Sequence, residues 1–276
     1  MQNSQWLDHA IQRLTSAGIE SARLDAIILL EDTTGKDRTW LLAHPEHLLT
    51  KHESTLLAKL LERRGTREPL AYMRSRAEFY GRTFFVVPDV LIPRPESEAM
   101  IDQIKSLAQA QHIDTIIDVG TGSGCLAISA KLALPDAHVI GIDISEGALE
   151  VARKNARTLG ARAQWERLDI MQDNFPHVPT AQSSVLLANL PYVPDGLVTS
   201  PEINKEPKIA LFSGRDGLDH YRALFGQVSK LPTKPLAIIT EALEDQHSSL
   251  ARIASVHGFV LQATHNLAQT FVLTTP

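Results

Sequence analysis

Residues 115–124 read Thr-Ile-Ile-Asp-Val-Gly-Thr-Gly-Ser-Gly, a short apolar run that stops at a cluster of glycines. Short apolar runs bounded by glycine are typical of buried strands. Glycine lets the backbone turn tightly and approach a ligand, because no Cβ stands in the way. The stretch therefore predicts a strand, a glycine-rich turn and the start of a helix.

Further apolar runs follow this stretch and alternate with helical patterns. They lie at 138–143, 184–188 and 236–240, and helical spacing covers 148–159. Strands read as continuous apolar runs when helices cover both faces of a parallel sheet. The last two runs, GFVLQAT and TFVLTT, are separated only by HNLAQ, which predicts an antiparallel pair. The pattern favours an α/β fold.

The chain before residue 113 has a different character. Apolar residues recur at helical spacing in the first seventy residues or so, and again at 97–111. Aromatic and β-branched residues cluster around Gly81 and Pro88, which suggests a β-hairpin. We therefore expect a helical domain at 1–75, a β-hairpin connector at 76–96 and an α/β domain at 97–276.

Composition narrows the class of protein. Of 276 residues, 43% are hydrophobic and 21% charged, so a packed core is expected. A net charge of −5 disfavours a general nucleic-acid coat, which needs an excess of Lys and Arg. The single cysteine, Cys125, excludes an internal disulfide and fits a reducing compartment. Without a signal peptide or an apolar run long enough to span a bilayer, we expect a cytoplasmic protein.

The glycine turn and the acid that follows it suggest a nucleotide-type ligand. Free N–H groups at a helix start favour a polar ligand end, and Asp143, at the end of the second run, can accept both hydroxyls of a ribose. The alternative is a plain turn with Asp143 as a helix cap. The spacing Gly-Thr-Gly-Ser-Gly differs from the dinucleotide pattern G-x-G-x-x-G, and no triphosphate P-loop is present.

Residues Asn189-Leu190-Pro191-Tyr192 follow the third run, where ligands bind in parallel sheets. The Asn189 side-chain oxygen and the Leu190 carbonyl could hold the two hydrogens of a flat NH2 group. Pro191 fixes the backbone, and Tyr192 offers a flat face. Such a grip would aim the nitrogen at an electrophilic methyl group. The alternative is an ordinary turn, because Asn and Pro are common turn formers.

Several other polar residues allow both a functional and a structural interpretation. A basic cluster, which includes Arg63, Arg64 and Arg67, is either a solvated face or a patch for an acidic partner. Arg94, Glu96 and Glu98 would shape the mouth of the site or cap the following helix. Glu241 ends a strand, where it either serves the site or only forms hydrogen bonds within the fold. No H-x-x-x-H pair occurs, so no metal is expected.

At these residues the sequence resembles the release-factor glutamine methyltransferases (HemK-type), a branch of the class I S-adenosylmethionine-dependent methyltransferases. The similarity covers nearly the whole chain, and its most specific stretches are LIPRPESE and EPKIAL with GRDGL. Other similar stretches are GKDRTWLLAHPE, REPLAYMRSRAEFYGRTFFV, DVGTGSGCLAIS and NLPYVP.

The resemblance implies a Rossmann-like, seven-stranded methyltransferase domain and a helical N-terminal domain that recognises a release factor. It implies that the glutamine of a Gly-Gly-Gln motif is methylated on its side-chain nitrogen, N5. The residues then expected to bind S-adenosylmethionine are Gly120, Thr121, Gly122, Ser123, Gly124, Asp143, Asp169, Ile170 and Asn189. The residues expected to bind the substrate are Asn189, Leu190, Pro191 and Tyr192, with Asn189, Pro191 and Tyr192 in catalysis. A monomer without a membrane or nucleic-acid partner is expected.

The sequence departs from the family pattern at a few places. Leu190 replaces a proline, Ile170 stands where many members carry an aromatic residue, and the C-terminal end lacks an expected arginine. Three other functions therefore stay open at this point. They are methylation of a ribosomal-protein glutamine, N6-methylation of adenine in nucleic acid, and cofactor binding without catalysis.

Overall fold

The computed structural model describes residues 1–172, 175 and 183–274. It divides into two compact units. The first contains residues 1–74 together with 200–205, and the second contains residues 75–199 and 206–276. The short segment 200–205 thus belongs to the helical unit, although it follows the Asn-Leu-Pro-Tyr motif in sequence. Nothing in the sequence pattern indicated this return of the chain.

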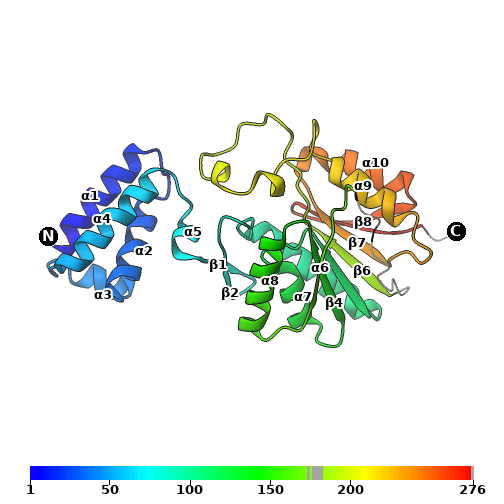
Figure 1. The fold of residues 1–276 in the computed structure, drawn as a ribbon, viewed down its shortest axis with the longest axis horizontal. Helices are drawn as coiled ribbons and strands as arrows, with labels where there is room; N and C mark the ends of the chain where they lie inside the picture. The colour runs from blue at the N-terminus through cyan, green and yellow to red at the C-terminus, as the bar shows by residue number, and fades with distance from the viewer. Residues whose placement is uncertain (173–174, 176–182, 275–276) are drawn as a thin grey trace. The chain divides into compact units, whose positions relative to one another are not determined.

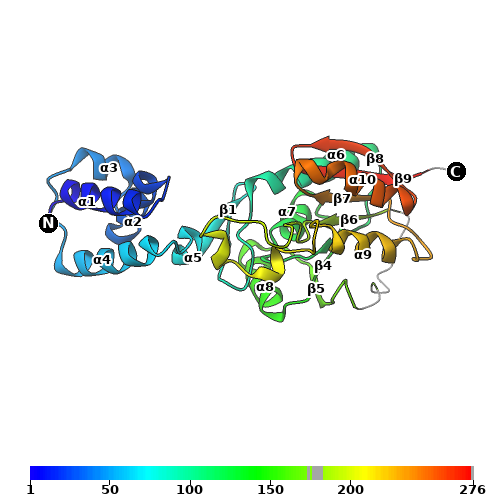
Figure 2. The ribbon, with the colours of Figure 1, turned by 90° about the horizontal axis from the view of Figure 1, so that it is seen from above.

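The first unit is a bundle of helices (Figure 2). Its elements are α1 (Asn3–Ser16), α2 (Ala22–Thr34), α3 (Arg38–Ala43), α4 (Lys51–Gly65), α5 (Leu70–Arg74) and the short η2 (Ile203–Lys205). Trp6, Ala10 and Leu14 recur at helical spacing on α1 and are buried together with Leu30 of α2 and Leu57 of α4. This shared apolar face holds the bundle together, because each helix alone would expose it to water.

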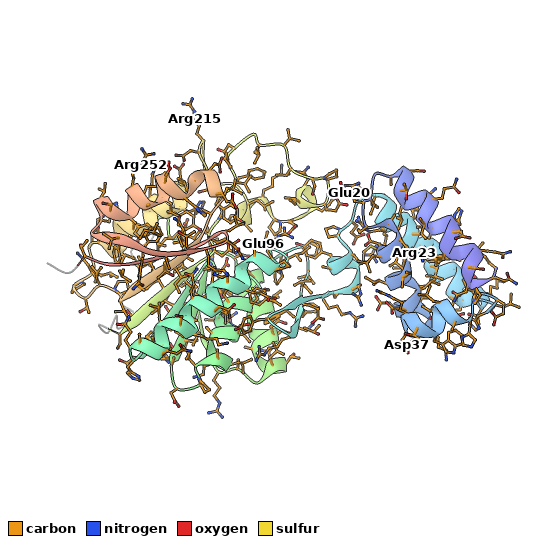
Figure 3. All side chains as sticks on the ribbon, turned by 180° about the vertical axis from the view of Figure 1, so that it is seen from behind. Glu20, Arg23, Asp37, Glu96, Arg215 and Arg252 are labelled. Atoms are coloured by element: carbon orange, nitrogen blue, oxygen red, sulfur yellow. The ribbon has the colours of Figure 1, made fainter. Side chains whose placement is uncertain are left out.

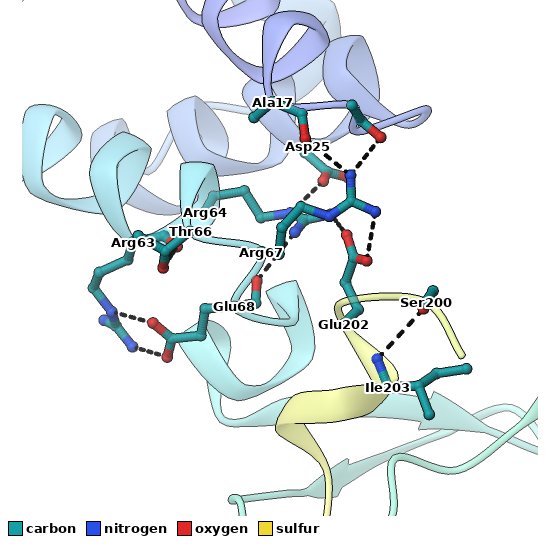
Figure 4. A network of polar contacts seen from close by, with 11 residues as sticks. Ala17, Asp25, Arg63, Arg64, Thr66, Arg67, Glu68, Ser200, Glu202 and Ile203 are labelled. Atoms are coloured by element: carbon teal, nitrogen blue, oxygen red, sulfur yellow. Dashed lines mark hydrogen bonds and ion pairs between the residues drawn. The ribbon is translucent and has the colours of Figure 1, made fainter. Parts of the chain in front are cut away.

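Arginines of the predicted basic cluster are engaged in ion pairs within this unit (Figure 4). The buried Arg64 Nε donates to Asp25 Oδ2 (2.7 Å), and its Nη2 donates to Glu202 Oε1 (3.0 Å). Arg67 Nη2 donates to the other oxygen of Glu202 (2.7 Å), and Arg63 pairs with Glu68. Arg64 and Arg67 therefore attach residues 200–205 to the bundle. Their ion pairs favour the structural interpretation for these two arginines.

The second unit contains a small hairpin and a large sheet (Figure 1). The hairpin strands β1 (Arg76–Phe79) and β2 (Arg82–Phe85) are joined at Tyr80 and Gly81, both with positive φ. The sheet order is β5-β4-β3-β6-β7-β9-β8. Its strands are β3 (Thr115–Val119), β4 (His138–Asp143), β5 (Gln164–Arg167), β6 (Ser184–Ala188), β7 (Ala237–Glu241), β8 (Phe259–His265) and β9 (Ala268–Leu273). The predicted Rossmann-like, seven-stranded sheet is confirmed.

Helices cover both faces of this sheet, which explains the continuous apolar strands. Neighbouring residues of one strand enter different cores: Ile116 packs with residues of α6 and α7, and Ile117 with residues of α9 and α10. The helices are α6 (Glu98–Ala110), α7 (Cys125–Ala133), α8 (Glu146–Leu159), α9 (Asp219–Val228) and α10 (His247–Val256), with short turns at η1 (Pro95–Ser97), η3 (Lys208–Ala210) and η4 (Glu244–Gln246).

Two details differ from the sequence pattern. Strand β5 (Gln-Trp-Glu-Arg) was not predicted, because it lies at the sheet edge and lacks an apolar run. The predicted antiparallel pair is confirmed as β8 and β9, and Thr275, the end of the expected run, lies outside the described residues. In the described part of the chain, no helix has the length and hydropathy needed to cross a bilayer.

Candidate active site

The glycine turn after β3 is held by its neighbour β4. Gly120, Gly122 and Gly124 all have positive φ, a conformation that disfavours side chains with a Cβ. The N–H groups of Gly120 and Thr121 both donate to the carbonyl of Ile142 (2.9 Å each). The turn therefore lies at the carboxyl ends of two adjacent parallel strands, where α/β sheets bind ligands.

Asp143 links the end of β4 to this turn. Its Oδ2 accepts from the Gly122 N–H (2.8 Å), and its Oδ1 accepts from the Ser145 N–H (2.9 Å). Burial raises the pKa of Asp143, while these hydrogen bonds oppose the shift. Each carboxylate oxygen retains a lone pair for a further donor. The acid can therefore accept the hydroxyls of a ribose while it fixes the loop.

A cavity of about 270 Å³ opens beside the turn. Its lining includes eight of the predicted site residues, namely Gly120, Gly122, Asp143, Asp169, Ile170, Asn189, Leu190 and Pro191. Thr121, Ser123, Gly124 and Tyr192 are not part of the lining. Apolar residues such as Val119, Ile142 and Ile170, together with the carboxylates of Asp143 and Asp169, give the cavity the mixed character of a nucleoside site. This lining fits S-adenosylmethionine, whose ribose hydroxyls Asp143 could accept.

Thr121, Ser123 and Gly124 support the loop from beneath. Thr121 Oγ1 donates to Asp118 Oδ2 (2.6 Å), and the Ser123 carbonyl accepts from Asn155 Nδ2 (2.9 Å). A Cβ at Gly124 would approach the ring of Trp165 to 3.1 Å. These residues thus set the shape of the turn from behind the cavity wall.

Asp118 is a residue whose importance the sequence did not reveal. It is completely buried at the end of β3, and its Oδ2 also accepts from the Ala127 N–H (3.1 Å). Its Oδ1 is buried without a hydrogen-bond partner among the described residues. Burial raises the pKa of Asp118 to about 7, against the effect of these hydrogen bonds. The carboxyl therefore titrates near neutral pH directly behind the cofactor loop.

Asn189 directly follows β6, and its side-chain NH2 group donates hydrogen bonds to two neighbouring residues. Its Nδ2 donates to Ser97 Oγ (2.8 Å) and to Glu241 Oε1 (3.2 Å). Within the described ranges, no protein group donates to Asn189 Oδ1 or to the Leu190 carbonyl. Both residues line the cavity. Two acceptor oxygens therefore remain available at this wall.

The rest of the motif is fixed by packing. The Leu190 side chain is buried, and its Cδ2 would lie 3.0 Å from a Cβ at Gly120. Tyr192 OH donates to Glu241 Oε1 (3.0 Å), and the Tyr192 carbonyl accepts from Gln246 Nε2 (2.7 Å). A leucine at position 190 thus gains a contact with the glycine turn, while its main-chain carbonyl remains in place.

The two segments with the most specific resemblance enclose this motif. A Cβ at Gly217 would collide with the Tyr192 carbonyl, so only glycine fits there. Arg94 forms an ion pair with the buried Glu206, and Glu98 Oε1 accepts from the Tyr80 N–H (2.8 Å). Arg215, in contrast, extends away from the sheet (Figure 3). Arg94 and Glu98 thus have structural partners, and the charge of Arg94 also acts on Tyr192 of the motif.

Near Asp169 and Ile170 the cavity has polar neighbours that the sequence did not reveal. His220 lines the cavity, and its ring Nδ1 lies 2.6 Å from Ser213 Oγ. Burial lowers the pKa of His220, whereas the charge of Asp169 raises it. The Ile170 carbonyl accepts from Gln227 Nε2. Among the residues that the structure describes, no group of three or more His, Cys, Asp and Glu side chains could hold a metal ion.

Comparisons with known proteins match both parts of the chain. A family described as the PrmC N-terminal domain matches residues 5–74, and one described as a methyltransferase domain matches residues 111–185. The release factor glutamine methyltransferase of Geobacter sulfurreducens is 35% identical, over 79% of this chain and 76% of that protein. That of Moorella thermoacetica is 34% identical, over 92% of this chain and 90% of that protein.

The chain is also similar to a longer relative and to a solved structure. The bifunctional methyltransferase of Rickettsia bellii is 32% identical over 96% of this chain, but the chain spans only 53% of that protein. The hMettl16 catalytic domain, solved with MAT2A 3′UTR hairpin 6, superposes with a TM-score of 0.53 at 11% identity. The match covers 74% of this chain and 91% of that domain, and it shows a shared fold.

Proposed function

This chain belongs to the family of release factor glutamine methyltransferases, and we propose that it methylates the side-chain amide nitrogen, N5, of a glutamine in a peptide chain release factor. The glutamine is that of the Gly-Gly-Gln motif, and the methyl donor is S-adenosylmethionine. The names of the relatives and the match to the PrmC N-terminal domain support the substrate class.

One observation supports the chemistry: Asn189 and Leu190 line the cavity, and among the described residues no group donates a hydrogen bond to Asn189 Oδ1 or to the Leu190 carbonyl. An amide nitrogen is a poor nucleophile, because its lone pair is delocalised into the carbonyl group. If each of its hydrogens is held by one of these oxygens, the NH2 plane is fixed. The oxygens also stabilise the positive charge that grows on nitrogen.

The remaining site residues bind and orient. S-adenosylmethionine supplies a methyl group that is activated by a positively charged sulfur. Gly120 to Gly124 would shape the loop beside it, Asp143 would accept its ribose hydroxyls, and Asp169 and Ile170 would lie near its adenine. Pro191 fixes the course of the main chain past the substrate amide, and Tyr192 holds this turn through Glu241. The proton lost from nitrogen leaves to solvent after the new N–C bond has formed.

The helical domain at 1–75 recognises the release factor, the segment 76–96 connects it to the methyltransferase domain at 97–276, and the enzyme acts as a monomer in the cytoplasm. The match of residues 5–74 to the PrmC N-terminal domain supports the first role. Sedimentation equilibrium of the purified protein tests the oligomeric state. A mass near twice 30.4 kDa would contradict a monomer.

The substrate is tested with purified enzyme, methyl-labelled S-adenosylmethionine and a release factor. We expect label in the wild-type release factor and none when the Gln of its Gly-Gly-Gln motif is changed to Ala. Equal labelling of both proteins would reject the assignment. A parallel assay with ribosomal RNA and ribosomal proteins tests the alternatives, since the same acceptor pair would fit the flat amino group of adenine.

A further inference from the structure

We infer that Glu241 is a positioning residue that determines which end of the Asn189 side-chain amide faces the substrate. The role rests on the proposed amide clamp and deepens it. Glu241 is the last residue of β7, it is fully buried, and it does not line the cavity. It acts on the reaction through Asn189.

The sheet itself brings these two residues together. Strands β6 and β7 are parallel neighbours, and Ala188 pairs with Thr240 in their register. The next residue on each strand is Asn189 and Glu241, respectively, so both leave the sheet at the same level. Tyr221 connects the two strand ends, because its hydroxyl donates to the carbonyls of Ala188 and Glu241. The separation between the two side chains is therefore set by a rigid part of the fold.

An asparagine amide can rotate so that its oxygen and its NH2 group exchange places with little change in shape. The clamp works in only one of these orientations, because an NH2 group facing the substrate would meet the NH2 group of the glutamine. A carboxylate accepts hydrogen bonds and, when ionised, donates none. Glu241 Oε1, at 3.2 Å from Asn189 Nδ2, thus selects the orientation in which Oδ1 faces the cavity.

Ser97 reinforces this choice. Its Oγ accepts from Asn189 Nδ2 (2.8 Å), and its hydroxyl also opposes the rise in the pKa of Glu241 that burial causes. Tyr192 OH also donates to Glu241 Oε1 (3.0 Å). Both hydrogens of Asn189 Nδ2 are then occupied, one by Ser97 and one by Glu241.

The test compares two replacements of Glu241. Glu241→Gln keeps one acceptor oxygen and can place its NH2 group at the position of Oε2, so we expect kcat within about fivefold of wild type. Glu241→Leu removes the acceptor, and we expect kcat to fall by about 10- to 100-fold, as for a misoriented catalytic group. The dissociation constant for S-adenosylmethionine should stay within about twofold in both variants. Gln269→Leu, a buried amide on the adjacent β9, is the control and should keep wild-type kcat.

A second measurement does not depend on any substrate. The side-chain NH2 resonances of Asn189, identified by their loss in Asn189→Ala, should show slow hydrogen exchange in the wild type. They should exchange at least about tenfold faster in Glu241→Leu and remain protected in Glu241→Gln. Ser97→Ala, which removes one of the two acceptors, should give the same change to a smaller extent. If Glu241→Leu does not fold, the exchange rates measured in Ser97→Ala provide the test instead.

The outcomes separate this inference from the proposed function. Unchanged kcat and unchanged Asn189 exchange in the folded Leu variant, or in Ser97→Ala in its place, would overturn the role of Glu241. An equal loss of kcat in the Gln and Leu variants would also overturn it, because the lost property would then be charge. If the wild type does not methylate a release factor but the Asn189 protons respond as expected, the proposed function fails and the positioning role holds.

Discussion

Asp118 is a carboxyl group enclosed by the core of the methyltransferase sheet. In the folded protein its pKa is about 7, compared with 3.8 for an unperturbed aspartate. The folded state therefore binds this proton more tightly than the unfolded chain does. The resulting stabilisation is complete below about pH 4, declines as the pH rises, and is lost above about pH 7.

The substitution Asp118→Asn should remove this dependence. Between pH 4 and pH 8, ionisation of Asp118 should lower the unfolding free energy of the wild-type protein by on the order of 3 kcal/mol. The variant lacks this contribution, so its unfolding free energy should fall by a correspondingly smaller amount. Urea unfolding at both pH values, without cofactor, provides the comparison. Asp143 and Glu241 also have raised pKa values, but they are present in both proteins and cancel. Parallel pH profiles would show that Asp118 is ionised throughout.

Asn189 is the residue on which the proposed chemistry depends most directly. Asn189→Ala removes one acceptor of the clamp, and kcat should fall by about 100- to 1,000-fold, as when one oriented hydrogen-bond partner is lost from a reacting group. The dissociation constant of S-adenosylmethionine, measured by calorimetry, should rise by less than about tenfold. A variant that turns over at the wild-type rate would remove Asn189 from the mechanism.

At the level of single residues, the sequence is most informative where a residue type has one main use. The spacing of the glycines and of an acid at a strand end pointed to Gly120, Gly122 and Asp143, which line the cavity. Glu241, Ser97 and His220 could not be assigned in this way, because their roles depend on partners from distant parts of the chain. The signal for Glu241 was its position at the end of a strand, but only the register of β6 and β7 shows that it meets Asn189.

At the level of elements, strand β4 is adapted to its neighbour β5. Gly141 of β4 pairs with Trp165, and a Cβ at Gly141 would lie 2.5 Å from the indole ring. The same ring lies 3.1 Å from the position of a Cβ at Gly124. One tryptophan thus covers two glycines, one in the strand and one in the cofactor turn.

The substitution Gly141→Ala should therefore overpack the space between β4 and the indole ring of Trp165. We expect it to lower the unfolding free energy by about 1–3 kcal/mol, because the indole has to shift. In the background of Trp165→Leu the same change should cost clearly less, and a double-mutant cycle by urea unfolding measures the difference. Additive effects would show that the ring is not what excludes a side chain at Gly141.

Sequence periodicity found the elements that are buried on both faces and missed the one at the edge. The strands β3, β4, β6 and β7 are fully or largely buried and read as apolar runs. Strand β5 exposes most of its side chains, so selection for an apolar sequence is absent there. This strand forms through backbone hydrogen bonds to β4. Such bonds place few requirements on residue type, so the sequence pattern does not predict the strand.

On the scale of the whole molecule, the helical unit is held by a buried ion-pair network. The side chain of Arg64 is only 6% exposed, whereas that of its sequence neighbour Arg63 is 47% exposed. Arg64→Leu leaves Asp25 as a buried carboxylate without its arginine, and we expect a loss of about 3–5 kcal/mol in the stability of this unit. Arg63→Leu, the matched control, breaks a surface pair and should cost at most about 1 kcal/mol.

Thermal or urea unfolding followed by the fluorescence of Trp6 and Trp40 reports on this unit, and Trp165 reports on the other. Equal effects of the two arginine substitutions would contradict the assignment of Arg64 to the core. The sequence could not distinguish them, because adjacent arginines on one helix look alike until the partners Asp25 and Glu202 are placed.

Residues 200–205 make the polypeptide pass three times from one unit to the other: after residue 74, after 199 and after 205. Neither unit is therefore encoded by one uninterrupted stretch of gene. Recombination at a single breakpoint near residue 75 would produce a hybrid in which Glu202 comes from one parent and its partners Arg64 and Arg67 come from the other. A different helical unit can be acquired intact only together with its own version of residues 200–205, so we expect these two stretches of sequence to change together.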